Sequence, residues 1–293
     1  MSRYDSFIIG QVCHDVNTDF GREPVREPGG AVLYSGFAAA AMGHRVAVLH
    51  KGNPETVDAP AVFKRQPAIK VFTLQSPQST LIRNVYLTSD RERREGFVDS
   101  QIDPYLPVEV PDVDAAVYQL AGLMRGDLGH DMIRLAASRA LAALDVQCIL
   151  RVVKDGRMVF EDWPEKREYL KLIQFLKTDA YEAEILTGHS DMEQAARVMG
   201  SWGAKEVMVT HNSRVIIFDG NRVYSQPLKP RNLKGRTGRG DTCFSCYITE
   251  RLSSGIADSL RLAAALVSLK METPGPYTGS REDAEAYARR FYD

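Results

Sequence analysis

Apolar runs alternate with amphipathic stretches along most of the chain. Residues 6–12 form a short apolar run typical of a buried strand, residues 31–42 a helix of small side chains, and residues 45–50 a second apolar strand. The same pattern predicts strands at residues 115–119 and 147–150 and helices at residues 131–143 and 165–175. Such alternation indicates a mostly parallel sheet with helices on both faces.

The C-terminal third continues this order. Strands are predicted at residues 207–210 and 215–218, and helices at residues 242–252, 256–270 and 281–290. The sequence contains no internal repeat and no low-complexity segment. One α/β domain that spans residues 1–293 is therefore the simplest organisation.

Two stretches interrupt the pattern. Residues 19–28 are polar and contain proline, and residues 80–100 suggest two short strands around a charged turn at 89–96. A β-ribbon outside a helix-covered sheet needs a surface to rest on. We therefore expect a small β lid over a ligand site, formed from about residues 14–28 and 80–100. The alternative is a solvated hairpin without a functional role.

Composition excludes several classes of function. Hydrophobic residues make up 44% of the chain and the net charge is -1, which argues against a nucleic-acid partner or an acidic membrane surface. The sequence shows neither a membrane-spanning window nor a signal-peptide pattern, so we expect a cytoplasmic protein. Cys243 and Cys246 lie in an apolar helical run, and we interpret them as packing residues rather than a redox or zinc pair.

The segment from Gly235 to Thr242 reads Gly-Arg-Thr-Gly-Arg-Gly-Asp-Thr and leads into a predicted helix. Closely spaced glycines let several backbone N–H groups turn toward one point, and the start of a helix adds unpaired N–H groups and the positive end of its dipole. This combination predicts an anion site. An aspartate fits there if it takes a proton from a hydroxyl that attacks a bound phosphoryl group, so Asp241 is the candidate catalytic base.

The rest of this segment has matching roles. We expect the backbone of Gly238, Arg239 and Gly240 to form an anion hole, with the side chain of Arg236 or Arg239 adding positive charge. The alternative is that Asp241 only caps the helix after a glycine turn.

The segment also resembles the second signature of the PfkB family, usually Asp-Thr-x-Gly-Ala-Gly-Asp-Thr/Ser-Phe. Thr237, Gly238, Gly240 and the Asp-Thr pair at 241–242 are in register. Gly235 stands where the family usually has Asp, and Arg239 stands where it has Ala. The base and the glycines are retained.

A second resemblance lies near the N-terminus. Gly29 and Gly30, followed by Ala38 and Gly43, resemble the first PfkB signature, with Tyr34 in the place of the usual Asn. Asp15 matches the family aspartate that accepts hydrogen bonds from substrate hydroxyls. The resemblance implies a substrate site at Asp15, Gly29, Gly30 and Tyr34, whereas on the residues alone the paired glycines also suit an ordinary turn.

Two further segments resemble the family's cofactor motifs. Asp179 and Glu182 match an Asn-x-x-Glu motif that organises Mg²⁺-bound water and phosphates, with Glu182 acting on the metal through water. Asp145 begins a segment found in inositol-kinase-like members; it is a further metal candidate, and Asp145 or Arg151 could reach the phosphates. A helix-capping pair at 179 and 182 and a structural ion pair at 145 and 151 are the alternatives.

A last match concerns the nucleotide. Thr210 begins a segment that resembles the family's Thr-x-Gly-x-x-Gly loop, but residues 211–214 lack its glycines. The resemblance implies that Asp179, Glu182, Thr210 and Arg236 bind the cofactor, which is ATP with Mg²⁺.

The matches run in family order from Asp15 to residues 274–275, nearly the whole chain. They imply a three-layer α/β/α ribokinase-like fold and an ATP-dependent kinase for a small sugar, polyol or cyclitol, with a slight preference for cyclitols and a lid edge that permits a homodimer. A nucleoside kinase of the same family and a non-catalytic nucleotide or sugar sensor stay open as alternatives. A Rossmann dehydrogenase is disfavoured because no Gly-x-Gly-x-x-Gly follows the first strand.

Overall fold

A computed structural model describes residues 3–88 and 93–293. Its main sheet has nine strands in the order β15-β14-β13-β12-β9-β8-β1-β4-β5. Neighbouring strands from β5 to β13 are parallel, and β14 and β15 are added antiparallel at one edge. The strands are β1 (Tyr4–Ile9), β4 (Val46–Gly52), β5 (Lys70–Gln75), β8 (Ala115–Leu120), β9 (Leu141–Asp145), β12 (Phe175–Asp179), β13 (Glu206–Thr210), β14 (Arg214–Phe218) and β15 (Val223–Pro227).

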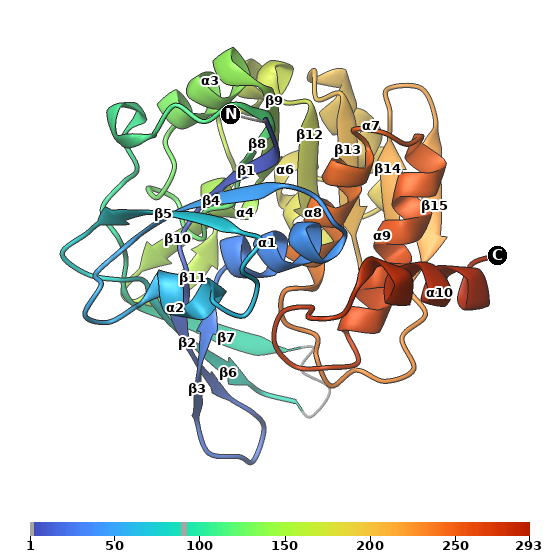
Figure 1. The fold of residues 1–293 in the computed structure, drawn as a ribbon. Helices are drawn as coiled ribbons and strands as arrows, with labels where there is room; N and C mark the ends of the chain where they lie inside the picture. Colours follow the sequence, from blue (N-terminus) through green and yellow to red (C-terminus); the bar gives the residue numbers. More distant parts are fainter. Residues whose placement is uncertain (1–2, 89–92) are drawn as a thin grey trace.

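Helices cover both faces of this sheet (Figure 1). One face packs against α3 (His130–Arg139), α6 (Ala180–Thr187) and α7 (Met192–Ser201), and the other against α1 (Ala31–Ala41), α8 (Arg239–Glu250), α9 (Ile256–Lys270) and α10 (Arg281–Phe291). Strand alternation explains the two layers, because Phe7 and Ile9 enter one core cluster and Ile8 enters another. The short helices are α2 (Ala59–Phe63), α4 (Gln147–Leu150) and α5 (Lys166–Tyr169). Within the described residues, no helix has the length and apolar character needed to cross a membrane.

A second sheet, which we call the lid sheet, has the order β10-β11-β7-β6-β2-β3. Only three residues separate the end of β1 from the start of β2, so the chain passes directly from the main sheet into the lid sheet (Figure 1). The lid strands are β2 (Cys13–Thr18), β3 (Val25–Gly29), β6 (Leu81–Tyr86), β7 (Arg94–Ser100), β10 (Arg151–Lys154) and β11 (Arg157–Phe160). Residues 89–92 of the predicted charged turn lie outside the described part of the chain.

Three predictions of secondary structure were wrong. The helix predicted at 131–143 ends at Arg139, and the next strand is β9, not residues 147–150, which form the short helix α4. The helix predicted at 165–175 is limited to α5 and a 3-10 turn at Leu170–Leu172. A short apolar run fits the hydrophobic repeat of a helix as well as that of a strand. Residues 141–145 form a strand because they pair with β8 on one side and β12 on the other. The sequence also gave no indication of the β10–β11 hairpin.

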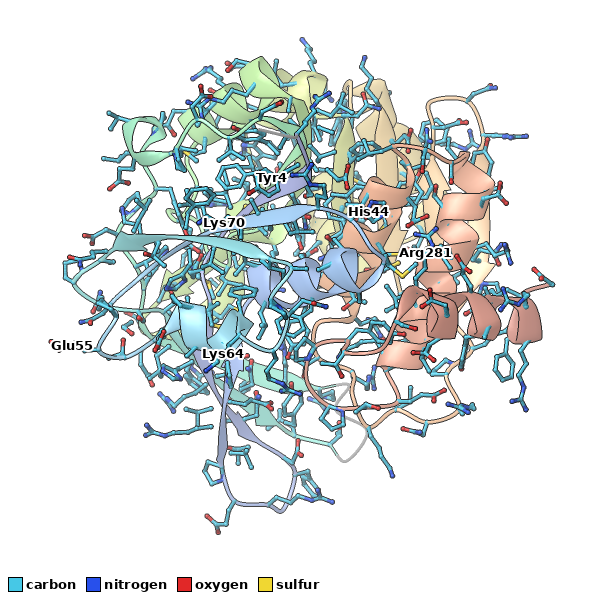
Figure 2. All side chains as sticks on the ribbon, in the orientation of Figure 1. Tyr4, His44, Glu55, Lys64, Lys70 and Arg281 are labelled. Atoms are coloured by element: carbon cyan, nitrogen blue, oxygen red, sulfur yellow. The ribbon has the colours of Figure 1, made fainter. Side chains whose placement is uncertain are left out.

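A buried ionic junction fixes α8 relative to its neighbours. Arg281 at the start of α10 donates to both carboxylate oxygens of Glu250 on α8, at 2.8 and 2.9 Å, and to the carbonyl oxygen of Met42 at 2.9 Å. The imidazole of His44 lies 2.7 Å from the same carboxylate, and Figure 2 shows His44 and Arg281 side by side where α1 and α10 meet. The helix that carries Asp241 is therefore anchored at its far end. Cys243 and Cys246 are buried, unpaired thiols on this helix, as expected.

Candidate active site

The glycine-rich segment forms a turn that ends at the start of α8. Gly238 has a φ of 75°, and a Cβ at this position would lie 2.1 Å from the ring of Tyr34, so only glycine fits. The amide of Thr242 makes the first helical bond, to the carbonyl oxygen of Gly238 at 3.0 Å. The amides of Gly240 and Asp241 precede this bond at the positive end of the helix, which is the arrangement expected of an anion site.

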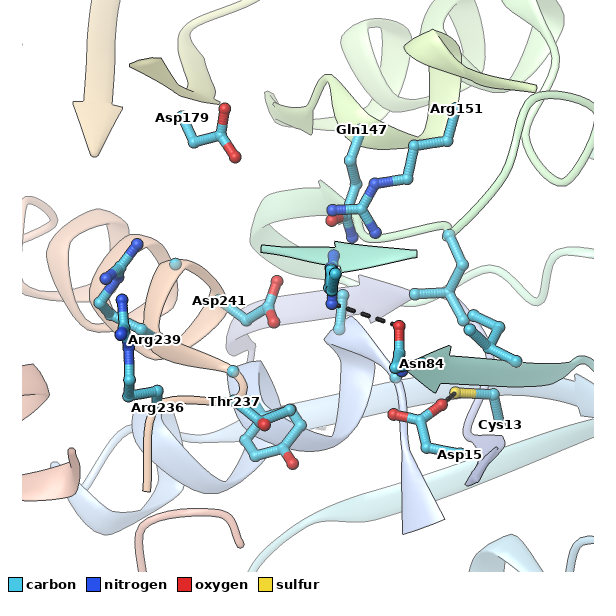
Figure 3. Close-up of a pocket in the computed structure, with 18 of the residues that line it drawn as sticks. Cys13, Asp15, Asn84, Gln147, Arg151, Asp179, Arg236, Thr237, Arg239 and Asp241 are labelled. Carbon is cyan, nitrogen blue, oxygen red and sulfur yellow. Dashed lines mark hydrogen bonds between the residues drawn. The ribbon is translucent and has the colours of Figure 1, made fainter. Parts of the chain in front are cut away.

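Three cationic side chains line the same end of the pocket: Lys177, Arg236 and Arg239. Figure 3 shows the two arginines next to each other on the side of Asp241 away from Asp15. Both arginines donate to Oδ1 of Asn212, at 3.1 and 2.6 Å, which holds them side by side. The chain of Lys177 passes beneath Gly240, whose missing Cβ would lie 3.0 Å from Lys177 Cε. Together these groups can neutralise several negative charges, and we call this part of the pocket the donor end.

Lys177 is buried but does not stand alone. Its ammonium donates to both oxygens of Asp145, at 3.1 and 2.9 Å, and lies 3.9 Å from the Glu182 carboxylate. Burial disfavours the ammonium, but these carboxylates outweigh it and raise the pKa of Lys177. Lys177 is therefore permanently charged at neutral pH.

Asp241 lines the pocket between the donor end and the lid sheet (Figure 3). Its enclosure in the protein raises the pKa of its carboxyl group, and the nearby Lys177 ammonium opposes this shift. Because a raised pKa makes a carboxylate a better proton acceptor, Asp241 is suited to act as a general base.

Asp179 and Glu182 make a complete capping box at the start of α6. The Glu182 amide donates to Asp179 at 2.8 Å, and the Asp179 amide donates to Glu182 at 2.9 Å. Glu182 is fully buried, its Oε1 has no hydrogen-bond partner, and burial raises the pKa of its carboxyl group. No group of three His, Cys, Asp or Glu side chains within the described residues is placed to ligate a metal directly. The Glu182 Oε1 atom lies 3.7 Å from Nη2 of Arg151, which makes an ion pair without a hydrogen bond.

Asp15 lies on β2 at the opposite end of the pocket, which we call the acceptor end. It accepts a hydrogen bond from Cys13 Sγ at 3.0 Å, and a Cβ on Gly29 would lie 2.2 Å from its Oδ2. Burial raises the pKa of Asp15, and the bond from Cys13 opposes this shift. Because side chains alternate along β2, His14 points away from the pocket and contacts the carbonyl oxygen of Thr56.

Further polar groups come from the strands of the lid sheet. Arg94 Nη1 lies 3.4 Å from Asn84 Oδ1, Asn84 donates to Asn17 at 3.0 Å, and Asn17 donates to Glu27 at 2.6 Å. Asn84 and Arg94 line the pocket beside Asp15. This connected set of donors and acceptors suits a ligand with several hydroxyl groups.

A family model for pfkB family carbohydrate kinases matches residues 17–283. The chain belongs to the PfkB family. A pyrophosphate-dependent kinase of the ribokinase family, solved with a pyrophosphate analogue and myo-inositol, is 33% identical to this PfkB chain, with a TM-score of 0.87 and coverage of 96% of this chain and 99% of that one.

Two further relatives share less of the sequence with this chain. Arabidopsis thaliana ribokinase, solved with ribose and ATP, is 16% identical over 98% of this chain and 99% of that one, with a TM-score of 0.73, which supports the fold alone. Cytidine kinase of Thermococcus kodakarensis is 23% identical over 247 residues, 81% of this chain and 84% of that protein. The predicted family and the predicted ribokinase-like fold are both confirmed.

The structure brings most of the predicted site residues of this PfkB kinase into one pocket. Its lining includes Asp15, Gly30, Tyr34, Asp179, Thr210, Arg236, Gly238, Arg239, Gly240 and Asp241. Gly29 lies behind Asp15, while Asp145 and Glu182 lie behind Lys177, so neither carboxylate reaches the pocket surface. Tyr34 is only 3% exposed, and its ring packs against Gly238 in the glycine-rich turn at residues 235–241, which we call the anion turn.

Sequence reasoning missed several lining residues. Lys177 is a lysine within a buried strand, a pattern that could have indicated an ion-paired or anion-binding group. Asn84 and Arg94 occupy the predicted lid strands, but their inward orientation depends on the register between β6 and β7. Gln147 was missed because residues 147–150 were predicted as a strand, whereas they form α4 after the end of β9.

Proposed function

We propose that this PfkB kinase transfers a phosphoryl group from inorganic pyrophosphate to a hydroxyl group of a cyclitol such as myo-inositol. The observation that carries the proposal is the donor end, where Lys177, Arg236 and Arg239 converge. Thr210 and Gly240, which lie beside Lys177 in the pocket lining, offer no apolar surface, whereas a nucleobase is usually held against aromatic or aliphatic side chains. The 33% identity with a pyrophosphate-dependent kinase supports the same donor.

The family resemblance implied ATP as the donor. Residues 211–214 lack the glycines of the family's nucleotide loop, and this difference also favours pyrophosphate over ATP.

In the proposed reaction, the hydroxyl oxygen of the acceptor attacks one phosphorus atom of pyrophosphate, and Asp241 accepts the proton of that hydroxyl group. The bridging P–O bond breaks, and inorganic phosphate leaves. The amides of the anion turn and the cations of the donor end stabilise the charge on the transferred group. Asp15 and Asn84 orient the other hydroxyls of the acceptor.

Of the three carboxylates Asp145, Asp179 and Glu182, only Asp179 lines the pocket, and it would hold a hydrated magnesium ion by accepting hydrogen bonds from its water shell. Glu182 and Asp145 lie behind Lys177 and would add negative charge without reaching the ion. When bound, the ion supplies neutralisation of phosphate charge.

Product formation measured by ³¹P NMR tests the proposal. The intact protein with MgCl₂ is supplied with either pyrophosphate or ATP and with myo-inositol, ribose, fructose or cytidine. We expect a phosphomonoester from pyrophosphate and myo-inositol. Turnover with ATP but not pyrophosphate would overturn the donor assignment and leave a kinase; turnover only with cytidine would favour a nucleoside kinase. Thermal stabilisation by ligands without any turnover would favour a sensor.

A further inference from the structure

Lys270, the last residue of α9, is buried beneath the anion turn. Only 2% of its surface is exposed. Its ammonium donates to the carbonyl oxygen of Gly235 at 2.6 Å and to that of Thr237, and it lies 5.0 Å from the centre of the Tyr34 ring. Its acceptors are therefore two carbonyl groups of the anion turn and one ring face that packs on Gly238.

The end of α9 and the anion turn are fastened together at more than one point. The Gly235 amide donates to the Met271 carbonyl oxygen at 2.7 Å, so the backbone and the Lys270 side chain hold the same residue. A Cβ on Gly235 would lie 1.8 Å from the Thr273 carbonyl oxygen, so the two segments are in direct backbone contact. This contact explains why glycine occupies position 235, where the PfkB signature usually has aspartate.

The two bonds of Lys270 determine where the neighbouring amides point. In a trans peptide the C=O and the following N–H point in opposite directions. Holding the carbonyl oxygen of Thr237 from below therefore directs the N–H of Gly238 away from Lys270, toward the pocket that Gly238 lines.

We propose that the ammonium of Lys270 is a positioning group for the donor site, which fixes the anion turn so that its amides face the donor phosphate. The assignment rests on the proposed function for the identity of the donor. Lys270 does not contact the donor itself and acts through the carbonyl groups of Gly235 and Thr237.

The charge of Lys270 is sensitive to pH. Burial lowers the pKa of its ammonium to about 8, Asp241 on α8 and Glu27 on β3 oppose this shift, and Arg239 on α8 adds to it. Tyr34 on α1 faces the ammonium with its ring. The group is charged at pH 7 and loses its proton as the pH rises through about 8, so donor binding should weaken there.

Kinetics of three variants test the assignment. Lys270→Met should raise the KM for pyrophosphate and lower kcat, for a combined loss of about 10- to 100-fold, the range seen when groups that orient a ligand-binding residue are removed. The KM for myo-inositol should not change. Lys234→Met, which removes an exposed lysine from the segment leading into the turn, is the matched control and should behave like the wild type.

Two readouts separate positioning from a loss of packing. The loss of donor kcat/KM above pH 8 should be present in the wild type and absent in Lys270→Met. Lys270→Ala should regain activity with ethylammonium, which has N–H donors for the two carbonyl groups, but not with tetramethylammonium, which has none. A cavity of about 400 Å³ lined by Lys270, Tyr277 and Tyr287 adjoins the vacated position and gives the amine access. A folded Lys270→Met protein with wild-type donor kinetics would overturn the assignment.

Hydrogen–deuterium exchange of residues 235–242 distinguishes this inference from the proposed donor. Without any ligand, exchange should be faster in Lys270→Met than in the wild type or Lys234→Met. Faster exchange supports the assignment even if pyrophosphate proves not to be the donor. Unchanged exchange overturns it even if pyrophosphate is the donor. Should Lys270→Met fail to fold, the wild-type pH profile decides: constant donor kcat/KM from pH 7 to 9.5 refutes the inference.

Discussion

Replacement of Asp241 by asparagine separates the role of this residue in catalysis from its effect on stability. The amide has nearly the same shape as the carboxylate but cannot accept the proton of a hydroxyl group. It also removes a negative charge that the fold disfavours, because the enclosure of the site raises the pKa of Asp241. We therefore expect Asp241→Asn to be less active and more stable than the wild type.

Both effects can be estimated. A positioned general base contributes about 10²- to 10⁴-fold to a rate, or about 3 to 5 kcal/mol in the barrier, so kcat should fall by that factor. Each tenfold change in acid dissociation corresponds to about 1.4 kcal/mol, so removing the buried charge should stabilise the fold by roughly 1 to 3 kcal/mol. For a chain of this size that is an increase in Tm of about 2 to 10 °C.

The sign of the pH dependence follows from linkage. The folded state binds the Asp241 proton more tightly than the unfolded state, so the wild type loses stability as the pH rises through the raised pKa. The difference in Tm between Asp241→Asn and the wild type should therefore be largest at pH 8 and shrink toward pH 5.

Differential scanning fluorimetry and the ³¹P NMR assay measure the two effects on the same samples. Asp112→Asn, which changes an exposed carboxylate in the segment before β8, is the control for asparagine substitution in general. Near-normal kcat in Asp241→Asn would refute the base assignment. A lower Tm at pH 8 would refute the reasoning on burial.

Three further predictions concern the same pocket. Lys177→Met leaves Asp145 and Glu182 buried without their shared partner, so thermal denaturation should show a loss of stability of about 3 to 5 kcal/mol. The control Lys154→Met, at an exposed ion pair, should change the stability by less than about 1 kcal/mol. Equal Tm values for the two variants would contradict the pairing. Arg239→Ala removes a charged hydrogen-bonding group from the donor end, so it should raise the KM for the phosphoryl donor at least about tenfold and leave the acceptor KM unchanged. A selective change in the acceptor KM would contradict the placement of Arg239 at the donor end. Arg222→Ala, at an exposed position, is the control. Because the pKa of Asp241 is raised, kcat/KM should fall with decreasing pH at a value above the ordinary aspartate pKa of about 4, and a profile that stays flat down to pH 4 would contradict that assignment.

Much of the architecture could be predicted because the central strands are buried on both faces. Runs such as residues 7–9 and 46–49 are continuously apolar, and the helices between the strands have the length that parallel connections need. The glycine turn before Asp241 was equally informative, since its spacing restricts the backbone more than the packing around it does.

Other features depend on contacts between distant segments. Residues 141–144 fit either a helix or a strand, and only the neighbours β8 and β12 make them a strand. Lys177 and Lys270 are ordinary residues in the sequence. Their importance comes from Asp145 and from the carbonyl groups of the anion turn, which lie more than thirty residues away along the chain. The donor is another such feature, because the cations that line the pocket come from separate elements.

The short link between β1 and β2 fixes the position of the proposed acceptor site relative to the main sheet. Its residues are held by the main domain: the Val12 amide donates to His50 at 3.1 Å, and Gln11 donates to Asp127 at 2.6 Å. Asp15, the residue of the lid sheet that we propose to contact the acceptor, is thus tied to the same rigid frame as Asp241. We therefore expect the distance between Asp15 and Asp241 to stay constant when the outer lid strands move. The shape of the acceptor would then decide which of its hydroxyl groups reaches the base.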